Sequence, residues 1–270
     1  MRRYSRLCFV VSLFLWAIPY SSAQTSGELV QVIPPSIQHA QPPSPDASAQ
    51  ELEQEADLYR EKKDLLDALD YFRAALAKEP KNARIENKIG ITELVMLRYP
   101  DAKKSFEHAI KLDHQFADAY NNLGVTEYEL RKYGKAIKLY EKALELRKDC
   151  ASYFANEGAA YYSKKEFEKA GEAYGEALRL DPTIFERTSR TGVAAQLPPN
   201  LEERAHFDYL VARLFAKEGD KDRSLQYLRR AMEEGYKQIN NVYKDPEFEG
   251  LRSDARFTEL MAAKPPAIPE

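Results

Sequence analysis

Cysteine and histidine are scarce in this chain of 270 residues, and each scarcity excludes a kind of site. There are two cysteines and four histidines. Cys8 lies in the N-terminal apolar run, so a chain processed after that run keeps only Cys150 and forms no internal disulfide. No histidine has a second histidine, a cysteine pair or an acidic partner at metal-ligand spacing. Stability therefore has to come from packing, and we expect no metal site.

Catalytic motifs are missing as well. The chain contains no G-x-S-x-G, no Walker loop, no dinucleotide fingerprint and no H-E-x-x-H. Its many carboxylates are the solvated faces expected of helices in a chain with 31% charged residues. We expect a protein that is not an enzyme, with no catalytic residues, no cofactor-binding residues and no cofactor.

The first 23 residues have the layout of a cleavable secretory signal peptide. Three arginines precede an apolar run from Leu7 to Ile18, and small residues ending at Ala23 follow. A membrane span needs about twenty apolar residues, so this run is short for a retained anchor, which is the alternative. We predict a signal peptide over residues 1–23 and a mature chain that begins at Gln24 and does not span a membrane. The expected location is periplasmic or secreted, with a bacterial periplasm preferred.

The charge of the mature chain argues against two classes of partner. Loss of the three arginines leaves 37 basic against 43 acidic residues, a formal charge of −6. An acidic protein is poorly suited to nucleic acid or to anionic lipid as its main partner. We therefore expect a protein or a peptide.

Residues 24–48 differ in composition from the rest of the chain. They hold five prolines, little charge and no apolar periodicity, and such a segment cannot bury enough apolar surface to offset the entropy of ordering. We predict a disordered tether. The alternative, a proline-rich ligand for another domain, lacks a P-x-x-P with a flanking basic residue.

A period of 34 residues begins at Ala49. With blocks that start at Ala49, Ala83, Ala117 and Ala151, small residues recur at the eighth, twentieth and twenty-seventh positions and aromatic residues at the twenty-fourth. The eighth position reads Ala56, Gly90, Gly124 and Gly158, and the twenty-fourth reads Phe72, Phe106, Tyr140 and Tyr174. Small residues are expected where two helices touch, and aromatic rings where the space between them has to be filled.

Several of these positions resemble the tetratricopeptide repeat family. The resemblance is carried by Asn122-Leu123-Gly124, Tyr133, Ala136, Tyr140, Ala143 and Asp181-Pro182. It covers four blocks, 49–82, 83–116, 117–150 and 151–184. It implies an all-α fold, a right-handed α-solenoid of antiparallel helix pairs, in which the first helix of each pair lines a concave groove. One departure is the turn position that the family often fills with glycine, which is Lys63, Leu97, Arg131 and Lys165 here.

The period breaks after Ile184. We assign residues 185–204 to an insertion that is most simply a connecting loop, with a flap over the groove as the alternative. Asn200 and Glu203 have the spacing of a capping box that opens a long helix. Residues 205–238 fit a divergent fifth repeat.

The C-terminal part contains two similar phrases. Asp245 and Asp254 are each followed by an aromatic residue and then a leucine, which predicts two short helices capped by the aspartates. Residues 239–264 then form a helical cap, in which Phe248, Leu251, Phe257 and Leu260 hide the end of the array from water; an interaction site there is the alternative. Residues 265–270 are expected to be a disordered tail.

The resemblance also implies a set of groove residues. In the family the ligand usually meets the second, fifth, ninth, twelfth and thirteenth positions of the first helices. Carried onto this chain, they include Asn87, Ile91, Leu94, Val95, Asn121, Val125, Tyr128, Glu129, Ala155, Ala159 and Tyr162. Amides can pair with an extended backbone and tyrosines offer flat contact area. The alternative is that these residues pack against the next helix or against the protein's own tail.

The kind of ligand that the chaperone-binding members of the family take is not expected here. Ser152 and Asn156 stand where the basic carboxylate clamp of chaperone-binding relatives would need lysine and arginine. A chaperone C-terminus is therefore a poor candidate.

Together these features predict a non-catalytic protein–protein interaction scaffold or adaptor in the cell envelope, which binds a peptide or a partner helix in the concave groove. The alternative is an accessory subunit of an envelope enzyme or transport complex, whose groove is buried by an obligate partner or by self-association.

Overall fold

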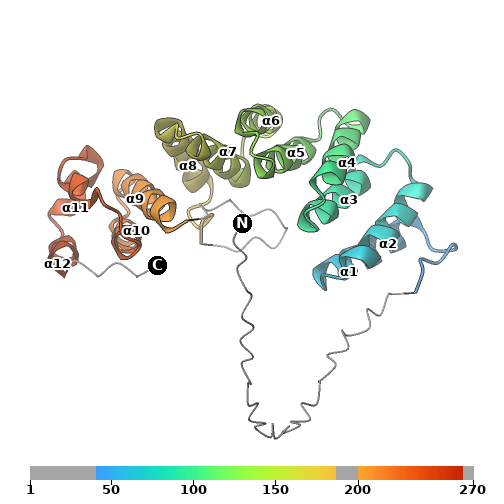
Figure 1. Ribbon diagram of the computed structural model, residues 1–270, viewed down its shortest axis with the longest axis horizontal. Helices are drawn as coiled ribbons and strands as arrows, with labels where there is room; N and C mark the ends of the chain where they lie inside the picture. The colour runs from blue at the N-terminus through green and yellow to red at the C-terminus, as the bar shows by residue number, and fades with distance from the viewer. Residues whose placement is uncertain (1–40, 187–199, 264–270) are drawn as a thin grey trace, which may run out of the picture. The chain divides into compact units, whose positions relative to one another are not determined.

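The computed structural model describes residues 41–186 and 200–263, and helices dominate both ranges (Figure 1). No strand occurs within these two ranges. The predicted signal peptide, the tether up to residue 40, residues 187–199 of the insertion and the tail lie outside the described residues.

Eight helices make up the four regular repeats, two to each block. They are α1 (Ala49–Glu61), α2 (Leu65–Lys78), α3 (Ala83–Val95), α4 (Tyr99–Leu112), α5 (Ala117–Glu129), α6 (Tyr133–Leu146), α7 (Ala151–Ser163) and α8 (Phe167–Leu180). The two helices of each pair pack together, and the second helix of each pair also packs against the first helix of the next pair. The expected all-α fold of stacked helix pairs is confirmed.

Contact between a small residue and an aromatic ring sets the spacing within a pair. A Cβ atom built on Gly124 would lie 2.6 Å from a ring carbon of Tyr140, and the same distance separates Gly90 from Phe106. No real Cβ tolerates such a distance, so only glycine allows these helices to approach this closely. This agrees with the small and aromatic positions of the 34-residue period.

The turn inside each regular pair places a residue other than glycine in the left-handed region. The φ angles are 67° at Lys63, 60° at Leu97, 58° at Arg131 and 63° at Lys165. The next residue closes each turn with the same bond; for example, the Asp64 N–H donates to the Tyr59 carbonyl at 2.9 Å. This is the closing bond of a Schellman motif. These four residues are the ones that the sequence places at the glycine position of the family.

The fifth pair follows the same plan with a longer first helix. It consists of α9 (Leu201–Lys217) and α10 (Lys221–Glu233), joined by a turn in which Gly219 has a φ of 79°. Asn200 caps α9, because its side-chain oxygen accepts from the Glu203 N–H at 2.8 Å. The helix therefore begins within the residues that the sequence assigns to the insertion.

Four short elements complete the described chain, and they bury the residues predicted to form a cap. The elements are the 3₁₀ turns η1 (Ile239–Tyr243) and η2 (Pro246–Phe248), and the helices α11 (Glu249–Arg252) and α12 (Ala255–Ala263). Phe248, Leu251, Phe257 and Leu260 are all buried in one hydrophobic core with α9 and α10. These side chains serve packing, as a cap requires.

The two aspartates of this region have different roles. The Arg256 N–H donates to Asp254 Oδ1 at 3.0 Å, as expected of a helix cap. Asp245 caps nothing with its side chain; its Oδ2 accepts from the Tyr209 hydroxyl at 2.8 Å. The cap predicted at Asp245 is therefore wrong, and this side chain ties the C-terminal elements to α9.

Residues 41–48 also differ from the expected tether. The Tyr71 hydroxyl donates to the Gln41 carbonyl at 2.9 Å, and Lys78 Nζ donates to the Pro45 carbonyl at 2.7 Å. Ser48 forms a capping box with Glu51 at the start of α1. The prediction of a disordered tether over residues 24–48 is corrected for residues 41–48, because a tyrosine and a lysine of α2 bind their backbone.

Candidate protein-binding surfaces

The predicted groove residues lie on α3, α5 and α7, and most of them are packed between helices. The buried ones are Asn87, Leu94, Asn121, Val125, Ala155, Ala159 and Tyr162; the half-buried ones are Ile91, Tyr128 and Glu129. Val95 alone in this set is exposed, at 43%. The alternative of packing against the next helix therefore describes seven of these eleven positions. We call the side of α3, α5 and α7 that carries them the predicted groove face.

The asparagines of this face bind one another. Asn122 Nδ2 donates to Asn87 Oδ1 at 3.1 Å, Asn121 Nδ2 donates to Asn122 Oδ1 at 3.1 Å, and Asn156 Nδ2 donates to Asn121 Oδ1 at 2.9 Å. The chain of amides joins three successive repeats. Buried amides need such partners, so these bonds hold the repeats together. Both amide atoms of Asn121 are occupied in this way, which leaves them no atom for a ligand backbone, whereas the bond at Asn87 uses Oδ1 alone.

The two groove tyrosines reach the next first helix. The Tyr128 hydroxyl lies 3.0 Å from Ser163 Oγ, and the Tyr162 hydroxyl donates to the Glu203 carbonyl at 2.8 Å. Burial raises the pKa of Tyr128 above its usual value, so the phenol stays neutral and can donate. Both tyrosines therefore link neighbouring repeats through their hydroxyl groups, in addition to offering ring area for contact.

Between the first helices of the first and second repeats, ion pairs stand in place of the amide bonds. Arg84 Nη2 lies 2.9 Å from Glu53 Oε2, and Lys88 Nζ lies 2.6 Å from Glu53 Oε1. Lys88 also pairs with Asp57. Glu53 is buried, so these contacts are poorly screened and fix α3 against α1.

The predicted groove face opens at the boundary between α7 and α9. A hollow of about 740 Å³ lies there, with rings from four residues in its walls: Tyr162, Phe167, His206 and Tyr236. His206 is parallel to Tyr236 with ring centroids 5.7 Å apart, and Phe167 meets His206 edge to face at 4.4 Å. Burial lowers the pKa of His206, so the imidazole is neutral at pH 7. We call this site the aromatic hollow.

Its edge carries charges of both signs. Lys165 and Lys237 line it together with Glu202 and Glu203. Aromatic walls orient an inserted group by their shape, and a few polar groups beside them are typical of a binding site. Such a site can receive a side chain of a partner.

The sequence did not identify the aromatic hollow as a site. The sequence assigned Tyr162 to the groove, and of the histidines it predicted only that none has a partner at metal-ligand spacing. His206 and Tyr236 belong to the divergent fifth repeat, and the insertion before it breaks the 34-residue register that assigns family positions in the regular repeats. The available signal was the number of aromatic residues near the break in the period.

A second hollow lies between α8 and α9 and measures about 770 Å³. Gly171 and Gly175 of α8 face Leu210 and Leu214 of α9, where added Cβ atoms would lie 3.4 Å and 3.6 Å from the leucine methyl groups. The space exists because two glycines stand where larger side chains would fill it.

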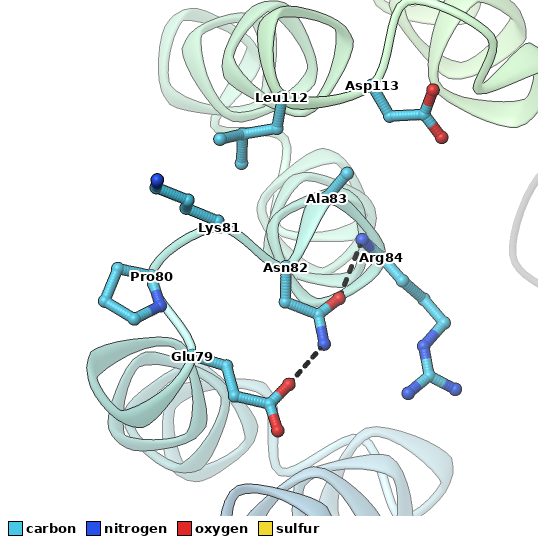
Figure 2. Close-up of a pocket in the computed structure, with 8 residues that line it drawn as sticks. All are labelled: Glu79, Pro80, Lys81, Asn82, Ala83, Arg84, Leu112 and Asp113. Atoms are coloured by element: carbon cyan, nitrogen blue, oxygen red, sulfur yellow. Dashed lines mark hydrogen bonds between the residues drawn. The ribbon is translucent and has the colours of Figure 1, made fainter.

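A third hollow, of about 760 Å³, lies at the turn between α2 and α3 (Figure 2). Its polar groups serve the turn itself: Asn82 Oδ1 accepts from the Arg84 N–H at 3.1 Å, and Asn82 Nδ2 donates to Glu79 at 2.7 Å. Because these groups already have partners, we do not assign this hollow a ligand.

The described part of the chain contains no cluster of three or more histidine, cysteine, aspartate or glutamate side chains able to hold a metal ion. Within the same residues, no helix has both the length and the apolar character to cross a membrane.

Comparison with known families identifies the repeats. Residues 117–150 and 151–184 each match a model described as "Tetratricopeptide repeat". These two blocks are therefore tetratricopeptide repeats, and the blocks before them share their period and their packing. No curated protein matches the chain in sequence.

Three solved structures are similar to this chain. A structure described as "Functional Characterization of Pseudomonas Aeruginosa pilF" is 20% identical, covers 76% of this chain and 82% of its own, and has a TM-score of 0.51. MamA from Desulfovibrio magneticus RS-1 is 16% identical over 73% and 97% of the two chains, with a TM-score of 0.49. YrrB, described as a TPR protein with an unusual peptide-binding site, is 18% identical over 73% and 92%, with a TM-score of 0.47. At 20% identity, the likeness to the pilF structure shows the fold alone.

Proposed function

We propose that this protein is a non-catalytic protein–protein interaction scaffold of the cell envelope, which holds a peptide or a partner helix on the predicted groove face. The observation that carries the proposal is the aromatic hollow. It is a recess with ring walls beside Tyr162, one of the predicted groove residues, most of which are otherwise buried between helices.

The chemistry of the hollow favours an inserted side chain. Ring walls bury apolar area and gain about 25 cal/mol per Å² removed from water. The half-buried Tyr128 and the exposed Val95 extend the contact toward α3. A partner segment that lies along α7 and α5 with one apolar or aromatic side chain in the hollow fits this surface.

The envelope location rests on the sequence alone. The arginines and the short apolar run before Ala23 support it, and fractionation of cells that produce the full chain would test it. Recovery with the cytoplasm would contradict that part of the proposal and leave the binding surface untouched.

Two tyrosine substitutions test the binding surface. Tyr236→Ala removes a wall of the hollow, whereas Tyr243→Ala removes an exposed ring of the neighbouring η1 outside it. In a pull-down from envelope extract, we expect a partner held by the parent and by Tyr243→Ala to be lost with Tyr236→Ala. Circular dichroism of each variant checks that the helices persist.

Equal recovery of the partner by all three proteins would rule out the hollow. If the parent binds only itself, as measured by a mass larger than one chain in light scattering, the alternative of an accessory subunit buried by self-association would replace the scaffold.

A further inference from the structure

A second surface lies along the edge formed by the turns within the helix pairs, and two apolar residues mark its start. Leu97 stands at the left-handed position of the α3–α4 turn with a φ of 60°, and its side chain is 69% exposed. The same position in the neighbouring repeats holds Lys63, Arg131 and Lys165. Those side chains keep a charge in water, whereas a leucine there exposes an apolar group and also bears the strain of the backbone.

Val95 adds to this exposure. It occupies the thirteenth position of its repeat, where the other regular repeats have Glu61, Glu129 and Ser163. Neither apolar side chain is explained by the packing of the array. Isolated exposed apolar side chains are common on proteins, and Leu58 and Leu66 are exposed as well, so Val95 and Leu97 gain meaning only from the charge that lies beside them.

The next turn along this edge is strongly basic. A depression of about 510 Å³ is lined by five cationic side chains and by no acidic one; the cations are Arg131, Lys132, Lys135, Lys138 and Lys164. Lys132 and Lys164 also pair with Glu127 and Glu166. The depression still has an excess of positive charge in a protein of net negative charge.

The charge is confined to the middle of the edge. The charges compared are those of the ten residues that begin at the fourteenth position of each repeat. Residues 62–71 carry two basic and three acidic side chains, residues 96–105 carry three basic and one acidic, and residues 130–139 carry four basic and no acidic ones. Residues 164–173 carry three basic and three acidic side chains, and residues 218–227 carry two basic and three acidic ones. The net charges are therefore −1, +2, +4, 0 and −1.

This profile selects the kind of partner. A broad anionic surface such as a bilayer would meet acidic residues at both ends of the edge, which repel it. A short acidic segment would meet only the basic centre and could place an apolar side chain on Leu97.

We propose that this basic edge, with Val95 and Leu97 beside it, docks an acidic amphipathic segment of a partner protein. The basic depression borders the aromatic hollow, because Lys164 lines the depression while Ser163 and Lys165 line the hollow, so one partner can contact both. The two sites together would hold a longer partner than either holds alone.

The test uses a defined probe, a fluorescent amphipathic peptide of alternating glutamate and leucine turns, with fluorescence anisotropy as the readout. Lys135→Glu with Lys138→Glu should weaken binding about tenfold. The control, Lys111→Glu with Lys148→Glu, changes the net charge equally at other exposed lysines and should leave the affinity unchanged.

Leu97→Gly separates a docking role from a structural one. It removes the apolar contact and should weaken binding about tenfold, while it raises the melting temperature because glycine relieves the left-handed strain. If Leu97 served only the fold, Leu97→Gly would lower both the melting temperature and the affinity for the peptide.

Three results overturn the proposal. They are failure of the parent to bind the peptide, equal weakening by the control pair, and binding of phosphatidylglycerol vesicles in place of the peptide. The last would assign the edge to a lipid surface. None of them bears on the aromatic hollow, which Tyr236→Ala tests separately.

Discussion

The joints between neighbouring first helices differ between the regular repeats and the fifth. In the regular repeats, contacts join residues 35 positions apart, such as Asn87 with Asn122 and Tyr128 with Ser163. Tyr162 occupies the position of Tyr128 one repeat later, yet its hydroxyl meets residues 41 and 44 positions ahead, Glu203 and His206. The insertion shifts the register at this joint.

The shift explains why one joint is closed and the other is hollow. A constant period lets each repeat offer the same partner to the next, so amides and ions pair in series. Once the register changes, rings replace those pairs and leave the aromatic hollow. The same break in sequence regularity therefore produces the opening that we assign to a partner.

The largest effect that distinguishes the two regions should come from buried phenylalanines. Phe248 packs under α9 and Phe106 lies inside the second repeat, and both are fully buried. Truncation of either to alanine should cost about 3–5 kcal/mol. Hydrogen exchange should show that Phe248→Ala opens residues 201–263 and spares residues 117–163, whereas Phe106→Ala opens the regular repeats. A uniform loss of protection in both variants would contradict a division between the regions.

Matched glycine substitutions compare packing in the two regions. Added Cβ atoms would lie 2.6 Å from Tyr174 at Gly158, but 3.4 Å from Leu210 at Gly171. Gly158→Ala should destabilise the protein by about 1–3 kcal/mol, as measured by urea denaturation. Gly171→Ala should be neutral or stabilise it by up to about 1 kcal/mol through helix propensity. Gly134→Ala, where nothing lies within 4 Å, controls for propensity alone. Equal costs at Gly158 and Gly171 would mean that the α8–α9 joint is as tight as the others.

The fifth repeat should respond to pH through Asp208. Burial raises the pKa of this carboxyl to about 7, although Arg230 opposes the shift. An unfolded aspartate titrates near 4, so the folded state holds an extra proton between about pH 4 and pH 7. Its stabilising contribution is complete below pH 4 and is lost as the pH rises through 7, by at most about 1.4 kcal/mol per pH unit.

Substitution isolates this contribution. Between pH 5 and pH 8 the urea midpoint of the parent should fall more than that of Asp208→Asn, while Asp70→Asn, an exposed control, should behave as the parent does. If Asp208→Asn retains the full pH dependence, the extra proton belongs elsewhere.

The smallest effect concerns the turns. Lys63 and Gly219 occupy equivalent left-handed positions in the first and fifth repeats. Lys63→Gly should stabilise the protein by about 1 kcal/mol and Gly219→Lys should destabilise it by about the same amount. Shifts of the melting temperature with the same sign in both variants would show that the two turns are not equivalent.

The sequence predicts the fold well because small and aromatic residues recur at the same positions of every 34-residue block. The positions of Gly124, Tyr140 and Arg131 follow from spacing alone, and the structure gives each the expected place. The start of α9 is also marked in the sequence, because Asn200 is a local cap.

The candidate site was harder to predict. A family position says which way a residue faces, but it does not say whether a neighbour already binds it, and Asn121 is held by Asn122 and Asn156. The aromatic hollow depends on the register between α7 and α9, which the period does not determine beyond the insertion. His206 therefore had no family position that could mark it as part of a site.

Site-specific photo-crosslinking in cell-envelope extract tests the central claim most directly. A photo-reactive amino acid replaces Gln238 beside the aromatic hollow in one protein, and Lys81 beside the α2–α3 hollow in another. We predict a cross-linked partner protein from position 238 and none from position 81. Cross-linking from position 81 alone, or equally from both positions, would contradict the assignment of the aromatic hollow as the working surface.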